Sequence, residues 1–126
     1  MKNRTPMSVL RRSTRRGHQG YPVATVAFYG PDDRRASKVV LGILRYEGAK
    51  PDLEKWMSQT GDLRHDTAIL QMILQRIREH GVRSVAMMDR IIGCPHEEGI
   101  DYPDGQACPQ CTFWRGRNRF TGEYGA

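Results

Sequence analysis

The stretch YPVATVAFYGPDDRRASKVVLGILRY, residues 21–46, decides how the fold is built. Its two flanks, YPVATVAFY and KVVLGILRY, are rich in the β-branched and aromatic residues that favour strands. The segment between them, GPDDRRAS, contains mostly turn-forming residues. The pattern predicts a β-hairpin with strands at about 22–30 and 37–46, joined by a loop around Gly30 to Asp33. Because both strands are almost continuously apolar, we expect both faces of the sheet to be covered.

A short helix is predicted after the hairpin, at about 51–59. Pro51 suits the first position of a helix, where the missing N–H costs nothing. Leu53, Trp56 and Met57 follow at a spacing that would place them on one apolar stripe of a helix.

A longer helix is predicted at about 66–80, and a third strand after it. Asp66 is a suitable N-cap, and Gly81 is typical of the position just beyond a helix C-terminus. Apolar side chains recur on one face of this helix, at Ile69, Leu70, Ile73, Leu74 and Ile77. The run VRSVAMM predicts a strand at about 82–88 that returns to the sheet. We therefore expect an α+β fold, with a small, mostly antiparallel sheet packed on two helices.

Composition excludes several classes of protein. The 126 residues are 38% hydrophobic and 27% charged, which is typical of one soluble globular domain. No apolar run is long enough for a membrane helix, and no hydrophobic stretch follows the basic N-terminus as in a secretory signal. Three cysteines in one short segment make a poor disulfide framework. We expect a cytoplasmic protein without a membrane partner.

The net charge of +6 comes entirely from residues 1–20. This segment holds six of the 20 basic residues and no acid, so the rest of the chain is formally neutral. We expect residues 1–20 to form a basic disordered arm, and residues 21–126 to form a single globular domain. An organelle-targeting sequence and a nucleic-acid-binding arm are the alternatives. In the nucleic-acid alternative, the contacts would come from Arg11, Arg12, Arg15 and Arg16.

All three cysteines lie in GCPHEEGIDYPDGQACPQC, residues 93–111. Cys94 and His96 are two residues apart, so in an extended segment both side chains point to the same side. Cys108 and Cys111 form a Cys-Pro-x-Cys motif, in which a tight turn directs backbone N–H groups toward the first sulfur. These four residues predict one structural Zn²⁺ held by three cysteines and one histidine, in a C-terminal lobe at about 91–120.

Other interpretations of the cysteines remain open. An iron–sulfur cluster and reduced thiols without metal are two of them. A Cys94–His96 catalytic pair is a third, although no group that would orient the histidine is evident.

An enzymatic alternative comes from zinc nucleobase deaminases, which carry His-x-Glu followed by Pro-Cys-x-x-Cys. A zinc-dependent hydrolase or deaminase of this kind would use His96, Cys108 and Cys111 as ligands and Glu98 as the proton shuttle. Only nine residues separate the two half-motifs here, and Ala107 replaces the proline. In addition, Cys94 provides a fourth ligand that would close the site to water.

Aromatic residues alternate with arginines after Cys111. The segment TFWRGRNRFTG contains Phe113, Trp114, Phe120, Arg115, Arg117 and Arg119. We expect Phe113 and Trp114 to cover the metal site while the arginines offset its net negative charge. Nucleic-acid contact by these arginines is the alternative. The leading hypothesis is a small zinc-binding module that binds a protein or nucleic acid and has no catalytic role.

Residues 91–123 resemble a group of small uncharacterised bacterial proteins. These proteins share GCPHEEGIDYP followed by CPxCxFW, and the hairpin segment AFYGPDDRRASKVVLGI is similar to theirs as well. No activity is known for the group. The resemblance implies a bacterial, cytoplasmic protein in which Cys94, His96, Cys108 and Cys111 act as a unit.

Overall fold

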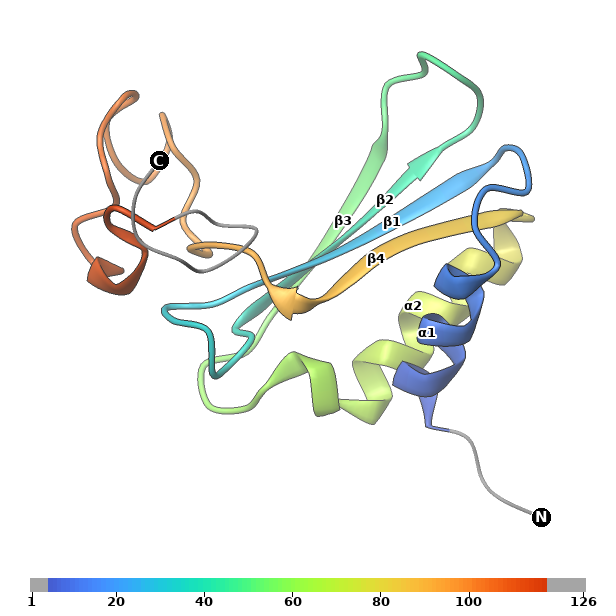
Figure 1. Cartoon of the computed structure of the whole chain (residues 1–126), viewed down its shortest axis with the longest axis horizontal. Coiled ribbons are helices and arrows are strands. Elements are labelled where there is room, and N and C mark those ends of the chain that lie inside the picture. Colours follow the sequence, from blue (N-terminus) through green and yellow to red (C-terminus); the bar gives the residue numbers. More distant parts are fainter. Residues whose placement is uncertain (1–4, 118–126) are drawn as a thin grey trace.

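Four strands form one sheet in the computed structural model, which describes residues 5–117 apart from the side chain of Asp89 (Figure 1). The elements are α1 (Pro6–Arg15), β1 (Val23–Tyr29), β2 (Lys38–Leu44), β3 (Asp52–Met57), α2 (Thr67–Glu79) and β4 (Ser84–Ile91), with 3₁₀ turns at Leu63–His65 and Thr112–Trp114. The strand order is β3-β2-β1-β4. Two pairs are antiparallel, and β4 runs parallel to β1. The predicted α+β fold with a mostly antiparallel sheet is confirmed.

The predicted hairpin is formed by β1 and β2, in a register that places Val26 opposite Leu41. Its loop closes with a hydrogen bond from the Ser37 N–H to the Tyr29 carbonyl oxygen at 2.8 Å. A glycine is required at the start of this loop, because a Cβ on Gly30 would lie 2.0 Å from the Arg35 carbonyl oxygen.

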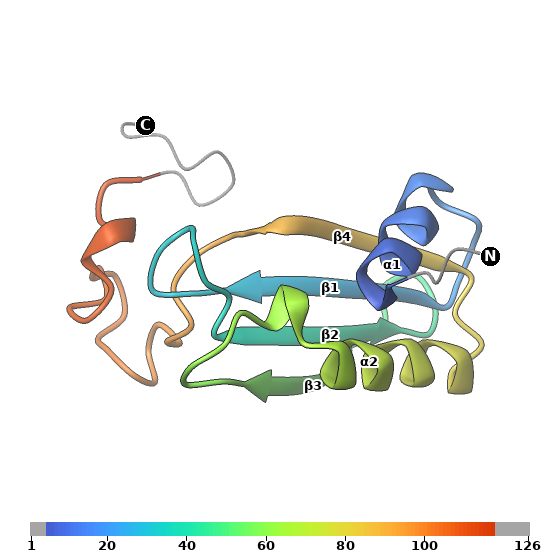
Figure 2. The same cartoon turned by 90° about the horizontal axis from the view of Figure 1, so that it is seen from below.

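Helices cover only one face of the sheet. Figure 2 shows α1 and α2 on the same side of the four strands. Side chains on that face are buried and form the core with the helices: Ala24, Val26, Phe28, Val39, Leu41, Ile43, Leu10, Leu70 and Ile73. On the other face, Thr25, Ala27 and Val40 are only half-buried. The expectation that both faces are covered is therefore wrong for the described part of the chain.

The segment predicted as a helix at 51–59 is strand β3, which pairs with β2. Alternation along a strand separates the three apolar residues that a helix would have grouped together. Trp56 packs against the core, while Leu53 and Met57 lie on the other face and are 59% and 67% exposed. Backbone pairing with β2 therefore outweighs the helical spacing of these residues.

Helix α1 corrects the prediction of a disordered arm for Pro6–Arg15. The Thr5 hydroxyl accepts a hydrogen bond from the Ser8 N–H at 3.1 Å, and a proline occupies the first helical position. Met7 and Leu10 are buried in the core. Because these apolar side chains have a surface to pack on, the segment folds despite its charge.

The predicted helix and strand at about 66–80 and 82–88 are confirmed as α2 and β4. The Asp66 carboxylate caps α2 by accepting from the Ile69 N–H at 3.1 Å. Gly81 ends the helix with a φ of 62°, in the region that favours glycine. Neither α1 nor α2 is long and apolar enough to cross a membrane, and they are the only α-helices of residues 5–117.

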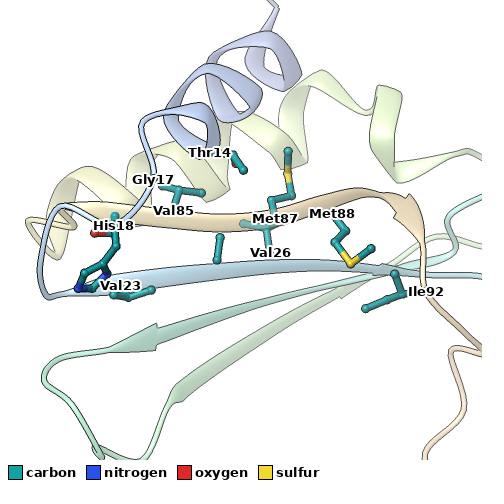
Figure 3. Close-up of a pocket in the computed structure, with 11 residues that line it drawn as sticks. Thr14, Gly17, His18, Val23, Val26, Val85, Met87, Met88 and Ile92 are labelled. Atoms are coloured by element: carbon teal, nitrogen blue, oxygen red, sulfur yellow. The ribbon is translucent and has the colours of Figure 1, made fainter. Parts of the chain in front are cut away.

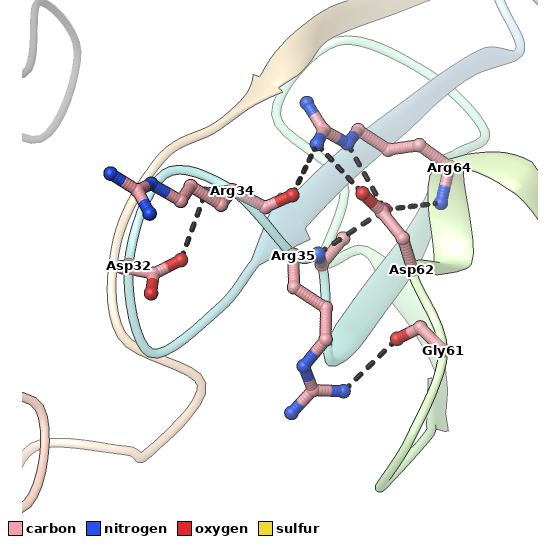
Figure 4. Close-up of polar contacts among 7 residues, drawn as sticks. Asp32, Arg34, Arg35, Gly61, Asp62 and Arg64 are labelled. Atoms are coloured by element: carbon pink, nitrogen blue, oxygen red, sulfur yellow. Dashed lines mark hydrogen bonds and ion pairs between the residues drawn. The ribbon is translucent and has the colours of Figure 1, made fainter.

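A polar cluster connects the β1–β2 loop to the segment before α2 (Figure 4). The Asp62 carboxylate accepts hydrogen bonds from the Ala36 N–H at 3.2 Å and from the Arg64 N–H, Nε–H and Nη2–H at 3.0, 3.1 and 2.7 Å. Arg64 also donates to the Arg34 carbonyl oxygen at 3.0 Å. Burial raises the pKa of Asp62, but these hydrogen bonds outweigh it and hold the pKa below its ordinary value.

Candidate metal centre

The chain leaves the sheet after β4 and forms an irregular lobe, residues 93–117, which we call the metal lobe (Figure 1). Backbone and side-chain hydrogen bonds attach it to the β1–β2 loop. The Gly30 N–H donates to the Gly93 carbonyl oxygen, and the Trp114 Nε1–H donates to the Gly30 carbonyl oxygen, both at 2.8 Å. Both bonds use Gly30, so the hairpin loop is one of the places where the metal lobe is attached to the sheet.

The four predicted metal ligands lie together in this lobe. The ligand atoms of Cys94, His96, Cys108 and Cys111 all lie within 4.8 Å of one another. The His96 Nδ1 atom is 3.2, 3.5 and 3.4 Å from the sulfurs of Cys94, Cys108 and Cys111. Ideal tetrahedral zinc bonded to sulfur and nitrogen would separate these atoms by about 3.6 Å. The cluster could therefore hold a metal ion.

Backbone N–H groups point at two of the sulfurs. The His96 N–H donates to the Cys94 sulfur at 3.3 Å. Burial raises the pKa of Cys108, but the N–H groups of Gln110 and Cys111 oppose it, and the resulting pKa is below that of an ordinary thiol. This is the arrangement predicted for the Cys-Pro-x-Cys turn, and such donors stabilise a thiolate.

The other two thiols resist ionisation in the absence of a cation. Burial raises the pKa of Cys94. The pKa of Cys111 is raised well above that of an ordinary thiol, first by burial and then by the adjoining thiols. Three half-buried or buried thiols in contact repel one another once they are charged, and a divalent ion removes that repulsion. The donor set therefore fits a divalent metal that binds thiolates.

The two glutamates after His96 have different contacts. The Glu98 carboxylate accepts a hydrogen bond from the Gly105 N–H at 2.7 Å, and so closes the loop between the two ligand pairs. Glu97 forms ion pairs with Lys55 and Lys38, and these two cations lower its pKa. Both carboxylates therefore have structural contacts within the described residues.

Lys38 is a site residue that sequence reasoning missed. Its side chain is only 8% exposed, and its ammonium group donates to the Pro95 carbonyl oxygen at 3.0 Å. Since Pro95 lies between Cys94 and His96, Lys38 positions this ligand pair against β2. The one sequence signal is a lysine at the start of the apolar strand segment KVVLGIL.

The aromatic residues after Cys111 have packing roles. Trp114 packs against the core, and its ring lies edge-on to Phe113, with 5.0 Å between ring centroids. The Arg117 guanidinium lies over the Phe113 ring at 4.0 Å and donates to the Phe113 carbonyl oxygen. The three cysteines, Trp114, Arg115 and Arg117 line one hollow of about 160 Å³. Trp114 thus lies at the hollow beside the cysteines, and the covering role of Phe113 stays a prediction.

The predicted nucleic-acid contacts do not form one surface. Figure 1 places α1 and the metal lobe at opposite ends of the sheet. The side chains of Arg11, Arg12, Arg15 and Arg16 are exposed on or just after α1, whereas Arg115 and Arg117 belong to the metal lobe. Arg119 and Phe120 lie outside the described residues.

Comparison with known proteins finds no match for this chain. The chain matches no protein-family model, no curated protein and no solved structure. The resemblance to small bacterial proteins stays a prediction, and the metal site is interpreted from its own geometry.

Proposed function

We propose that this protein is a small zinc protein, in which one Zn²⁺ has a structural role, and that it works by binding a partner. One observation carries the proposal: four ligand atoms, three sulfurs and one imidazole nitrogen, lie close together in one cluster. Zn²⁺ favours this donor set and needs no further ligand in a tetrahedral site. A site of four protein ligands has no open position for water or substrate.

Contacts of Cys94 and Glu98 speak against the enzymatic alternative. A deaminase-like or hydrolytic zinc site needs three protein ligands, a bound water and a free carboxylate. Here the Cys94 sulfur is 3.2 Å from His96 Nδ1, at ligand distance, and one oxygen of the Glu98 carboxylate accepts a hydrogen bond from the Gly105 N–H. The geometry therefore supports a closed site.

The composition of the metal lobe supports a structural role for the ion. Apart from one 3₁₀ turn, its described part has no helix or strand, and only Trp114 of this lobe packs against the core. A structural zinc contributes about 10–16 kcal/mol of apparent binding free energy in small peptides, which is enough to order such a segment. Cysteines stay reduced and free to bind metal most readily in a reducing compartment, and we propose the bacterial cytoplasm.

Elemental analysis of the purified protein tests the proposal. We expect one zinc per chain, and Cys94→Ala should lower the zinc affinity by more than about 100-fold, because it removes a ligand. Glu98→Gln is the matched control: its amide oxygen can still accept from Gly105, so zinc content should not change.

Cobalt substitution gives a second reading of the coordination. The visible spectrum of the Co²⁺ protein should change on Cys94→Ala and should not change on Glu98→Gln. A Cys94→Ala protein that keeps its zinc and the parent spectrum would contradict the closed site and favour the enzymatic alternative.

A further inference from the structure

The outer edge of β4 is unpaired within residues 5–117. Strand order places β4 outside β1, and no described strand lies beyond it. With eight residues, β4 is longer than the opposite edge strand, β3, which has six. An exposed strand edge carries a row of unpaired N–H and C=O groups, and proteins normally cover it or use it to bind another strand.

An apolar hollow of about 490 Å³ runs along this edge (Figure 3). Its lining includes five consecutive residues, 84–88, whose side chains alternate between the two faces of the sheet. Because five consecutive residues of the edge strand line it, the hollow runs along β4. Its apolar lining consists of Met87, Met88, Val23, Val26, Val85, Ala86 and Ile92. Methionine side chains adapt readily to different apolar partners.

Positive charge gathers at one end of the hollow. Arg15 and Arg16 end α1 directly before Gly17 and His18, which line the hollow, and Arg83 immediately precedes β4. All three arginines are exposed, and no described acidic side chain forms an ion pair with any of them.

We propose that the outer edge of β4 binds an extended segment of a partner protein as an added strand. The segment's apolar side chains would enter the hollow, and acidic residues at one end would lie beside Arg15, Arg16 and Arg83. The inference rests on the proposed binding role and does not depend on the zinc. Strand addition uses the backbone groups of an edge strand for affinity and side-chain pockets for specificity. The edge of β4 offers the first, and the hollow beside it offers the second.

A partner protein fits this edge better than two other occupants. A second copy would present its own β4, SVAMMDRI, in which Asp89 stands beside Arg90, so this strand carries no net negative charge to complement the three arginines. Nucleic acid would use the arginines but would leave the apolar hollow unoccupied, since phosphate binding needs only positive charge.

The test is selection of nine-residue random peptides, displayed on phage, against the full-length zinc-loaded protein. A parallel selection uses Met88→Lys, which places a charge in the hollow. We expect peptides with alternating apolar residues and acids at one end, whose affinity falls at least about tenfold on Met88→Lys. Met72→Lys is the matched control, because Met72 is 38% exposed on α2 and Met88 is 40% exposed. This control should leave peptide binding unchanged.

Two further measurements make the result specific. Hydrogen exchange of β4 amides should slow when a selected peptide binds, while exchange in α2 stays the same. The double variant R15E/R16E should lose the preference for acidic peptides. Zinc content is measured on every sample, so a failed zinc role and a failed strand-binding role are told apart.

Several outcomes would overturn the inference. One is the recovery of no peptides that distinguish the parent protein from Met88→Lys. Another is dimerisation in sedimentation experiments that Met88→Lys abolishes, which would make a second copy the occupant. If oligo-dT displaces the selected peptides and slows hydrogen exchange of the same β4 amides, the occupant is nucleic acid and the inference is wrong.

Discussion

Replacement of Asp62 by asparagine would remove one negative charge from the cluster that joins the β1–β2 loop to α2. The Asp62 side chain is 17% exposed and that of its partner Arg64 is 20% exposed, so solvent screens the pair only in part. The carboxylate accepts four hydrogen bonds, three of them from Arg64 and one from Ala36. Asparagine keeps one acceptor oxygen and loses the two-oxygen contact with the guanidinium.

We expect Asp62→Asn to lower the free energy of unfolding by about 2 kcal/mol at pH 7, since hydrogen bonds to charged groups contribute about 1.5–3 kcal/mol. The pKa of Asp62 is lowered below 3.8 in the folded protein. A lowered pKa means that this stabilisation is fully present above the unfolded pKa and is lost as pH falls through the folded pKa. The difference between parent and variant should therefore shrink below about pH 4.

Urea unfolding of both proteins between pH 7 and pH 3 measures this difference at each pH. Loss of metal in acid affects both proteins alike, so it cancels in the comparison. Asp32→Asn is the control, because Asp32 lies in the same loop region but accepts only one hydrogen bond in the described structure, from the Arg34 N–H. A difference at pH 3 as large as that at pH 7 would show that the carboxylate charge is not the cause.

Two further predictions concern the metal lobe and the first helix. Trp114→Phe removes the hydrogen bond to the Gly30 carbonyl oxygen and should destabilise the metal lobe by about 1–2 kcal/mol. Amide exchange should then rise in residues 93–117 but not in α2, and an equal rise in both would contradict a local role. Leu10→Ala should cost about 2–4 kcal/mol in urea unfolding, because Leu10 is fully buried. The exposed Arg12→Ala control should cost less than about 0.5 kcal/mol, and equal costs would mean that α1 is not packed on the sheet.

The hairpin, α2 and the metal ligands were predictable because their signals are local. Residues 21–46 alternate strand and turn composition, and Asp66 and Gly81 bracket one apolar stripe. The metal ligands follow from spacing alone, since Cys108 and Cys111 must share one turn. Lys38 was not predictable, because its contact with the Pro95 carbonyl oxygen depends on how the metal lobe folds back over β2.

The prediction was wrong where local spacing supports two structures. Leu53, Trp56 and Met57 fit a helical stripe, but the unpaired edge of β2 provides a partner that a local pattern does not contain. Helix α1 was missed because its arginines dominate the composition. Thr5 followed by a proline is an N-cap signal, and with the apolar Met7 it could have revealed the helix.

The parallel pairing of β1 with β4 affects how the chain folds while it is being synthesised. The hairpin can form early from local contacts, but α1 precedes it in the chain and packs on β4, which is made later. Until then, Met7, Leu10 and the core face of β1 have no complete surface to cover them. A nascent chain that has not reached β4 thus exposes apolar surface, the condition in which chaperones act and aggregation begins. The native sheet can form only after synthesis has passed Ile91.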